Sequence, residues 1–305
     1  YLLPFTDARY PAQLRDSPVA PVALWVAGDA AALAACQVAL VGSRQPTPSG
    51  REIAAEWAGT FVGKGLVVTS GFAAGIDAAA HRGALAAGGR TIAVCATGLD
   101  RCYPAEHADL AREIAAAGAL VSCFPLGAPP RPASFHRRNR LLAALAVATV
   151  VVEAADGSGS LITARYAQAL ERLVFAVPGS IRNPAARGCH ALLRQGAGLA
   201  ASAADVLAGF GLAPVARPAQ TTRAGREYGK YARPALGPRL DKAGEILLDA
   251  LGFEPVDVDT LVTRTGLPAQ AVSSMLLILE LQGWVAPHAG RYCRLVPAAS
   301  EGRAT

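Results

Sequence analysis

The sequence predicts an α/β protein with an extended Rossmann-like, doubly wound parallel sheet and a small C-terminal winged-helix domain. Three observations favour this fold class. Short apolar, β-branched runs alternate with Ala-rich segments of helical length from residue 37 to about residue 210. A Pro-rich basic segment follows, and residues 240–298 then show the pattern of three helices and a hairpin. Unbroken apolar strands separated by helices indicate a parallel sheet that is covered on both faces.

The elements of the predicted sheet alternate along the chain. Strands are expected at 37–41, 66–69, 91–96, 119–122, 149–152 and 173–177. Helices are expected between them at 49–63, 76–87, 105–117, 135–146 and 160–172. Residues 1–36 form a Pro-rich lead-in that we expect to pack on this domain, which then spans residues 1–212.

Two further segments follow this domain. Residues 213–239 hold four prolines and few large apolar side chains, which predicts an extended linker. The last domain, 240–298, has expected helices at 240–251, 258–265 and 269–282 and a hairpin at 284–295. Three helices and a hairpin in so short a span are typical of a winged helix.

Composition excludes several classes of protein. Hydrophobic residues make up 52% of the 305 residues, enough for a large core. No run of about eighteen uncharged apolar residues occurs, so no membrane span is expected, and residues 1–7 lack the pattern of a signal peptide. The six cysteines form no Cys-x-x-Cys pair and mostly lie in apolar runs. We therefore expect reduced thiols, no metal site and a cytoplasmic protein.

The positive charge is unevenly distributed. The net charge is +6, and the linker 213–239 holds six basic residues against one acid. The last domain is acidic instead, because residues 240–305 hold eight acids and five basic residues. A basic first domain and a basic linker favour an anionic partner.

Glycine- and serine-rich loops follow the predicted strands. In such loops backbone amides can approach an anion closely, and the start of the next helix adds favourable partial charge. Parallel strands bring these loops to one edge of the sheet, where open α/β sheets bind ligands. The chain lacks a phosphate-binding Gly-Lys-Ser/Thr loop and a complete dinucleotide fingerprint, so no nucleotide cofactor is expected. The loops begin Gly42-Ser43-Arg44, Ser70-Gly71-Phe72, Gly98-Leu99-Asp100, Gly157-Ser158-Gly159-Ser160 and Gly179-Ser180.

One helix start combines an aromatic residue, three arginines and an amide. Guanidinium groups match phosphate oxygens, and an aromatic ring can carry a base on its face. Positive charges at a helix N-terminus also oppose the helix dipole, so a purely structural role is less favourable. This segment is Phe135-His136-Arg137-Arg138-Asn139-Arg140.

Several acids and histidines invite a catalytic interpretation. Asp77 and His81 lie four residues apart on one expected helix, where we favour a structural role with a hydrogen bond between them. Glu153 and Asp156 follow a strand. No nucleophile, base and orienting group stand at a recognisable spacing, so we expect no catalysis.

These segments resemble the bacterial DNA-processing protein A (DprA, or Smf) family. The resemblance covers residues 1 to about 210, and the winged helix fits the tail of many members. It rests on the Gly42, Ser70 and Phe135 segments together with Gly75-Ile76-Asp77, Gly157–Ala164, Val177-Pro178-Gly179-Ser180, Asn183-Pro184 and Arg187-Gly188-Cys189-His190.

The resemblance implies a cytoplasmic protein of natural transformation that dimerises through its Rossmann-like domain. Such proteins coat incoming single-stranded DNA, protect it and help load the recombinase RecA. Two positions depart from the family pattern, Ala74 in place of a basic residue and Cys123 in place of a glutamate, and the N-terminal helical module of many members is not seen. The expected DNA-binding residues are Ser43, Arg44, Gly71, Phe72, Phe135, Arg137, Arg138, Asn139, Arg140, Ser158, Gly159, Ser160 and Thr163.

Two alternatives stand beside single-stranded DNA binding. A Rossmann-like nucleotide phosphoribohydrolase or nucleotide sensor would share the sheet, but the Pro-Gly-Gly-x-Gly-Thr loop of those hydrolases is missing. A winged helix that reads duplex DNA needs basic residues on its third helix, and residues 269–282 contain no Lys or Arg. We expect this domain to dock a protein or to steady an oligomer.

Overall fold

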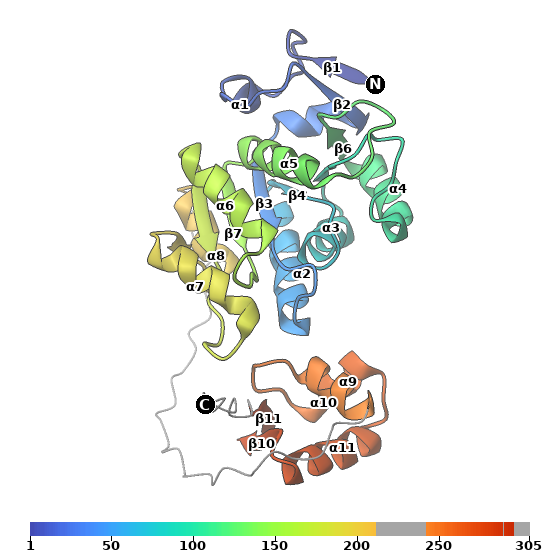
Figure 1. Cartoon of the computed structure of the whole chain (residues 1–305), viewed down its shortest axis with the longest axis vertical. Helices are drawn as coiled ribbons and strands as arrows, with labels where there is room; N and C mark the ends of the chain where they lie inside the picture. Colours follow the sequence, from blue (N-terminus) through green and yellow to red (C-terminus); the bar gives the residue numbers. More distant parts are fainter. Residues whose placement is uncertain (212–241, 289, 296–305) are drawn as a thin grey trace, which may run out of the picture. The chain divides into compact units, whose positions relative to one another are not determined.

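The computed structural model describes residues 1–211, 242–288 and 290–295. The chain divides into two compact units whose boundary falls near residue 214, drawn from blue to yellow and from orange to red in Figure 1. The predicted linker, 213–239, lies outside the described residues. Within these ranges, none of the helices combines the length and hydropathy that a membrane span requires.

The first unit is built on a nine-stranded sheet in the order β1-β2-β6-β5-β4-β3-β7-β8-β9. From β6 to β9 in this order the neighbouring strands run parallel. At the other edge β1 and β2 add an antiparallel pair. The strands are β1 (Leu2–Pro4), β2 (Ala23–Gly28), β3 (Gln37–Val41), β4 (Val67–Ser70), β5 (Thr91–Val94), β6 (Ala119–Ser122), β7 (Ala148–Val151), β8 (Leu173–Ala176) and β9 (Gly198–Leu199).

Helices cover both faces of this sheet because the strands are apolar on both sides. In β3, Val38 and Leu40 pack with α2, α3 and α8 on one face, whereas Ala39 and Val41 pack with α5, α6 and α7 on the other. Successive side chains of a strand point to opposite faces, so each strand feeds two hydrophobic cores. The helices are α1 (Ala12–Arg15), α2 (Pro48–Gly63), α3 (Ile76–Ala86), α4 (Ala108–Ala117), α5 (Pro132–Leu145), α6 (Gly159–Ala169), α7 (Arg187–Arg194) and α8 (Ala203–Gly209).

The strand order reverses between β3 and β7. From β3 the chain proceeds through β4 and β5 to β6 on one side, and from β7 it proceeds through β8 to β9 on the other. The connection after β3 leads into α2 on one face, and the connection after β7 leads into α6 on the opposite face. Such a reversal leaves a crevice beyond the carboxyl ends of the two strands.

The second unit contains three helices and a two-stranded sheet. The helices α9 (Lys242–Leu251), α10 (Val258–Thr265) and α11 (Ala269–Leu281) pack around a small apolar core, with β10 (Val285–His288) antiparallel to β11 (Arg291–Arg294). The Asp257 side chain accepts a hydrogen bond of 2.8 Å from the backbone N–H of Thr260, which caps α10. This is the predicted winged helix.

Most elements match the sequence expectation within a few residues. The strands at 37–41 and 119–122 and the helix at 258–265 have the predicted bounds. The lead-in packs on the first unit as expected, but its strands β1 and β2 were not predicted, and neither was the short β9. Helix α5 begins at Pro132 rather than at residue 135, because Pro is well suited to a first helical turn.

We expect Phe61→Ala to lower the free energy of unfolding by about 3–5 kcal/mol, because the ring is fully buried between α2 and the sheet. Urea unfolding followed by circular dichroism measures this change. Val22→Ala removes apolar atoms from a side chain that is 88% exposed, so its effect should stay within about 0.5 kcal/mol. Equal losses in the two variants would contradict the assignment of Phe61 to the core.

Candidate functional site

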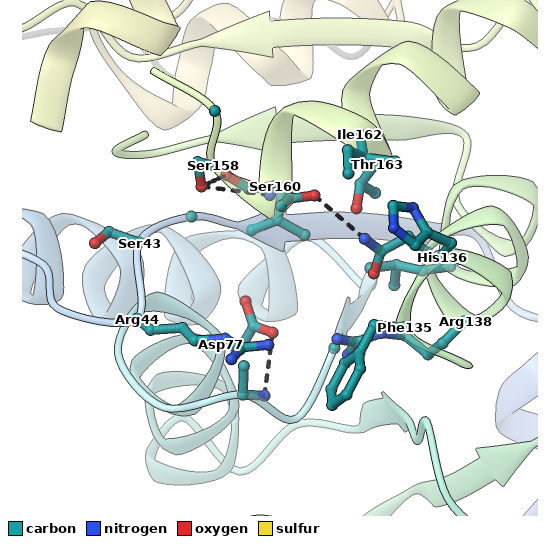
Figure 2. A pocket seen from close by; sticks show the side chains of 18 of the residues that line it. Ser43, Arg44, Asp77, Phe135, His136, Arg138, Ser158, Ser160, Ile162 and Thr163 are labelled. Carbon is teal, nitrogen blue, oxygen red and sulfur yellow. Dashed lines mark hydrogen bonds between the residues drawn. The ribbon is translucent and has the colours of Figure 1, made fainter. Parts of the chain in front are cut away.

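A pocket of about 480 Å³ lies at the reversal of strand order. Its walls are residues 42–44 after β3, Gly71 and Ala73 after β4, Asp77 of α3, residues 155–158 after β7, the start of α6, and side chains between residues 135 and 142 of α5. Figure 2 shows their side chains converging on this pocket. We call it the switch-point pocket.

The structure brings ten of the thirteen predicted residues to the switch-point pocket. The other three lie elsewhere: Phe72 is buried beside a neighbouring pocket of about 190 Å³, while Arg137 and Arg140 do not line either of these pockets. Two of the five glycine loops, those at Gly98 and Gly179, also lie away from it. The ten residues are Ser43, Arg44, Gly71, Phe135, Arg138, Asn139, Ser158, Gly159, Ser160 and Thr163.

Arg44 and Phe135 form one side of the pocket. The Arg44 guanidinium carbon lies 5.3 Å from the centre of the Phe135 ring, and that of Arg138 lies 5.8 Å from it. A guanidinium at this distance is attracted by the ring's quadrupole. Arg44 is exposed, so it keeps its donors available to a ligand while the ring holds its position.

Arg138 is buried, in contrast to Arg44. It is 5% exposed, and its Nη1 donates to the carbonyl of Val94 at 3.2 Å. Asp77, 6% exposed, accepts a hydrogen bond of 3.2 Å from the N–H of Ala73 through Oδ2. Burial raises the pKa of Asp77, and the positive charge of Arg138 opposes that shift. Arg138 is therefore a buried counter-charge at the floor of the pocket rather than a free guanidinium.

Gly71 makes room for these two charges. A Cβ at this position would collide with the Arg138 guanidinium and come within 2.7 Å of Asp77 Oδ2. Gly75 has φ +80°, and a Cβ there would collide with the backbone at Ser43 and Arg44. Both glycines thus allow loops from different strands to meet at the pocket.

The first turn of α6 forms the opposite side of the pocket. Ser158 Oγ lies 2.8 Å from Ser160 Oγ and accepts from the Ser160 N–H at 3.4 Å. Asn139 Nδ2 donates to the carbonyl of Gly159 at 3.2 Å and joins α5 to α6. The Thr163 side chain, 2% exposed, also lines the pocket. The free N–H groups of a helix start and nearby hydroxyls are donors suited to an anion.

The expected hydrogen bond between Asp77 and His81 does not form. The Nδ1 atom of His81 lies 2.7 Å from Thr91 Oγ1. The Thr91 hydroxyl itself donates to the carbonyl of Val68 at 2.8 Å, so Nδ1 must carry the proton and donate to Thr91. Burial lowers the pKa of His81 to about 3. His81 is a neutral core residue under the pocket.

Ten of the twenty residues that line the pocket were not among the predicted DNA-binding residues, and two of them are side chains near its helix starts. His136 and Ile162 line the pocket from α5 and α6. His136 lies inside the aromatic and basic segment 135–140, so the sequence pattern that predicted DNA binding there could also have identified His136. An isolated isoleucine gives none, because apolar residues on a helix usually indicate the core.

The fold and the pocket define a Rossmann-like protein with an arginine-containing switch-point pocket, followed by a winged helix. The family model of the DNA recombination-mediator protein A matches residues 1–211, and that of the DprA winged helix domain matches residues 232–291. The chain therefore belongs to the DNA recombination-mediator protein A (DprA) family, as the sequence motifs predicted.

Relatives and solved structures agree with this assignment. Protein Smf of Escherichia coli is 40% identical over 298 residues, which are 97% of this chain and 77% of the relative. The X-ray structure of DprA from Streptococcus pneumoniae is similar with a TM-score of 0.66 and 40% identity over 68% of this chain and 73% of that one. DNA processing protein A of Helicobacter pylori, whose structural study concerns its single-stranded DNA binding mode, has a TM-score of 0.61 and 29% identity over 66% and 92%.

We expect acid to destabilise the chain partly through His81. Its pKa is lowered in the folded state, so between pH 6.5 and about 3 the unfolded state binds the extra proton and stability falls as pH falls. At pH 5 the loss from this residue alone should be about 2 kcal/mol. Urea unfolding at several pH values measures the slope, which His81→Gln should reduce. His136→Gln, at an exposed position, should keep the slope, and an unchanged slope in His81→Gln would contradict the assignment.

Proposed function

We propose that the switch-point pocket binds single-stranded DNA through its phosphate backbone. The observation that carries this proposal is the meeting of Arg44, the first turn of α6 and four hydroxyl side chains around one pocket. Arginine supplies charge and paired donors, and the helix start supplies N–H groups, so both sides of the pocket suit phosphate oxygens. The single-stranded DNA binding mode named for the H. pylori relative supports the same ligand.

Backbone contacts of this kind carry little sequence information. Phe135 can add stacking with a base, worth about 1–3 kcal/mol and tolerant of sequence, because every base has an aromatic face. A flexible single strand can bend into a pocket of this size, whereas a stiff duplex cannot. We therefore propose weak base preference and a preference for single strands over duplex.

We propose that the pocket binds DNA without catalysing a reaction. Asp77 is buried opposite Arg138 and bonded to the backbone of Ala73. Ser43 Oγ accepts from the N–H of Gln45 at 3.1 Å, and Ser158 pairs with Ser160, so within the described part of the chain neither serine is hydrogen-bonded to a base. A nucleophile needs a base within hydrogen-bond reach.

Family membership supports a wider role. We propose that the protein acts in the cytoplasm during natural transformation, protects incoming strands and helps load RecA. We further propose that it works as a homodimer joined through the Rossmann-like unit. These proposals about transformation, RecA loading and dimerisation rest on family membership rather than on the geometry of the pocket.

We assign different roles to the three predicted segments. Residues 1–212 bind the strand, and the basic residues of 213–239 add non-specific attraction. For residues 240–298 we propose a protein partner, because α11 carries no Lys or Arg and exposes Leu277, Ile278 and Leu281. An apolar face without positive charge suits a protein surface better than a phosphate backbone.

We expect Arg44→Ala to weaken single-stranded DNA binding on all sequences alike. The log–log dependence of affinity on salt should lose about 0.7 of its slope, the contribution of one neutralised phosphate. Fluorescence anisotropy with labelled homopolymers at several salt concentrations measures both effects. Arg82→Ala removes a charge from an exposed position of α3 outside the pocket and is the control. If Arg44→Ala binds as tightly as the parent, the pocket assignment fails.

We expect a chain shortened to residues 1–239 to keep single-stranded DNA binding. The pocket and both hydrophobic cores around it belong to residues 1–211. The dissociation constant for a labelled strand should stay within a few-fold of that of the full chain. Loss of binding in the shortened chain would assign the winged helix to the DNA interface instead.

A further inference from the structure

A positive surface continues from the switch-point pocket along α5 and α6. The two helices lie side by side (Figure 1), and residues of both line the pocket, among them His136 of α5 and Ile162 of α6. Residues four apart on a helix lie on one face, one turn further on. The residues one turn on from His136 and Ile162 are Arg140 and Tyr166, and neither of them lines the pocket.

The side chains of these two residues are in contact. The Arg140 guanidinium carbon lies 5.5 Å from the centre of the Tyr166 ring, so one side chain from each helix meets the other. Arg140 is exposed and Tyr166 half-buried, and the neighbouring Arg165 on α6 is exposed as well. We call Arg140, Arg165 and Tyr166 the α5–α6 ridge.

The charge of the two helices has one sign. Residues 132–145 and 159–169 contain four arginines and no aspartate or glutamate. Arg138 is buried at the pocket floor, and Arg137 stacks 5.4 Å from Phe124, an aromatic residue that precedes α5. Arg137, Arg140 and Arg165 are all exposed, and Arg140 is the one whose aromatic partner, Tyr166, lies on the other helix.

We propose that the α5–α6 ridge is a second contact for the DNA strand, which the strand reaches as it leaves the switch-point pocket. This proposal rests on the proposed function of the pocket. Arg140 lies over the Tyr166 ring and is exposed, so its N–H groups remain available for a base or a phosphate oxygen. Fixing the guanidinium on a ring before binding lowers the entropy lost when DNA is held.

If the ridge binds DNA, the effect of ridge substitutions on affinity should depend on the length of the DNA strand. A short oligonucleotide of about four nucleotides occupies only the pocket, whereas one of about sixteen nucleotides also passes over the ridge. Arg140→Ala combined with Arg165→Ala should leave the affinity for the short strand unchanged. Loss of each arginine should weaken binding of the long strand about fivefold at 0.1 M salt. One phosphate contact contributes about 0.7 to the slope of log affinity against log salt concentration.

The experiment compares both strands in anisotropy titrations of the full chain. Arg82→Ala is the charge-matched control, and thermal unfolding checks that each variant is folded. In Tyr166→Leu the apolar packing is kept while the ring is lost, so long-strand affinity should fall and Arg140→Ala should add little to that loss.

The outcomes separate this proposal from the pocket itself. Loss of affinity for both strands in Arg44→Ala, with loss for the long strand alone in the ridge variant, supports both proposals. If Arg44→Ala weakens binding and the ridge variant binds the long strand like Arg82→Ala, the ridge is not a DNA contact while the pocket stands. If Arg44→Ala has no effect on either strand, the proposed function of the pocket fails first. A ridge variant that loses a protein partner and keeps DNA binding overturns the proposal in favour of a protein surface.

Discussion

The reversal of strand order between β3 and β7 creates the space in which every functional element meets. The connection after β3 turns to the face of α2 and the connection after β7 turns to the face of α6, so no connection crosses the crevice between the two strand ends. Three loops and two helix starts surround that space. The rest of the sheet fixes their positions, because its strands are buried on both faces and cannot shift without exposing a core.

The floor of the pocket contains opposite charges that are largely removed from water. Taking Arg138 and Asp77 out of water is unfavourable, and their mutual attraction, the Val94 carbonyl and the Ala73 N–H offset part of that cost. Gly71 is tied to this arrangement, since a Cβ there would collide with the Arg138 guanidinium, whereas a Cβ at Gly75 would collide with the backbone of Ser43 and Arg44. A buried counter-charge also limits how much positive potential reaches the pocket, so Arg44 becomes the exposed guanidinium that faces a ligand.

The sequence predicted the elements whose pattern is local. Gln37–Val41 and Ala119–Ser122 are short apolar runs with clear ends, and they were placed to the residue. Strands β1 and β9 were not predicted because they are short edge strands. Strand β2 was not predicted because it is partly exposed along its length, and its pairing with β1 and β6 depends on distant partners. The arginines of one segment show the same limit. The sequence alone does not distinguish Arg137, Arg138 and Arg140. A helix turns about 100° per residue, so the packing of the helix decides which of the three is buried.

The two units differ in charge, and this difference affects which unit suits DNA and which suits a protein partner. DNA repels acidic surfaces within about one Debye length, roughly 8–10 Å at physiological salt, and residues 240–305 carry more acids than basic residues. A strand held along the pocket and the α5–α6 ridge would then leave the face of Leu277, Ile278 and Leu281 without competition from nucleic acid. The proposed protein partner of that face therefore does not compete with DNA for the same residues. The separation of basic and acidic surfaces thus makes the two proposed interactions compatible rather than exclusive.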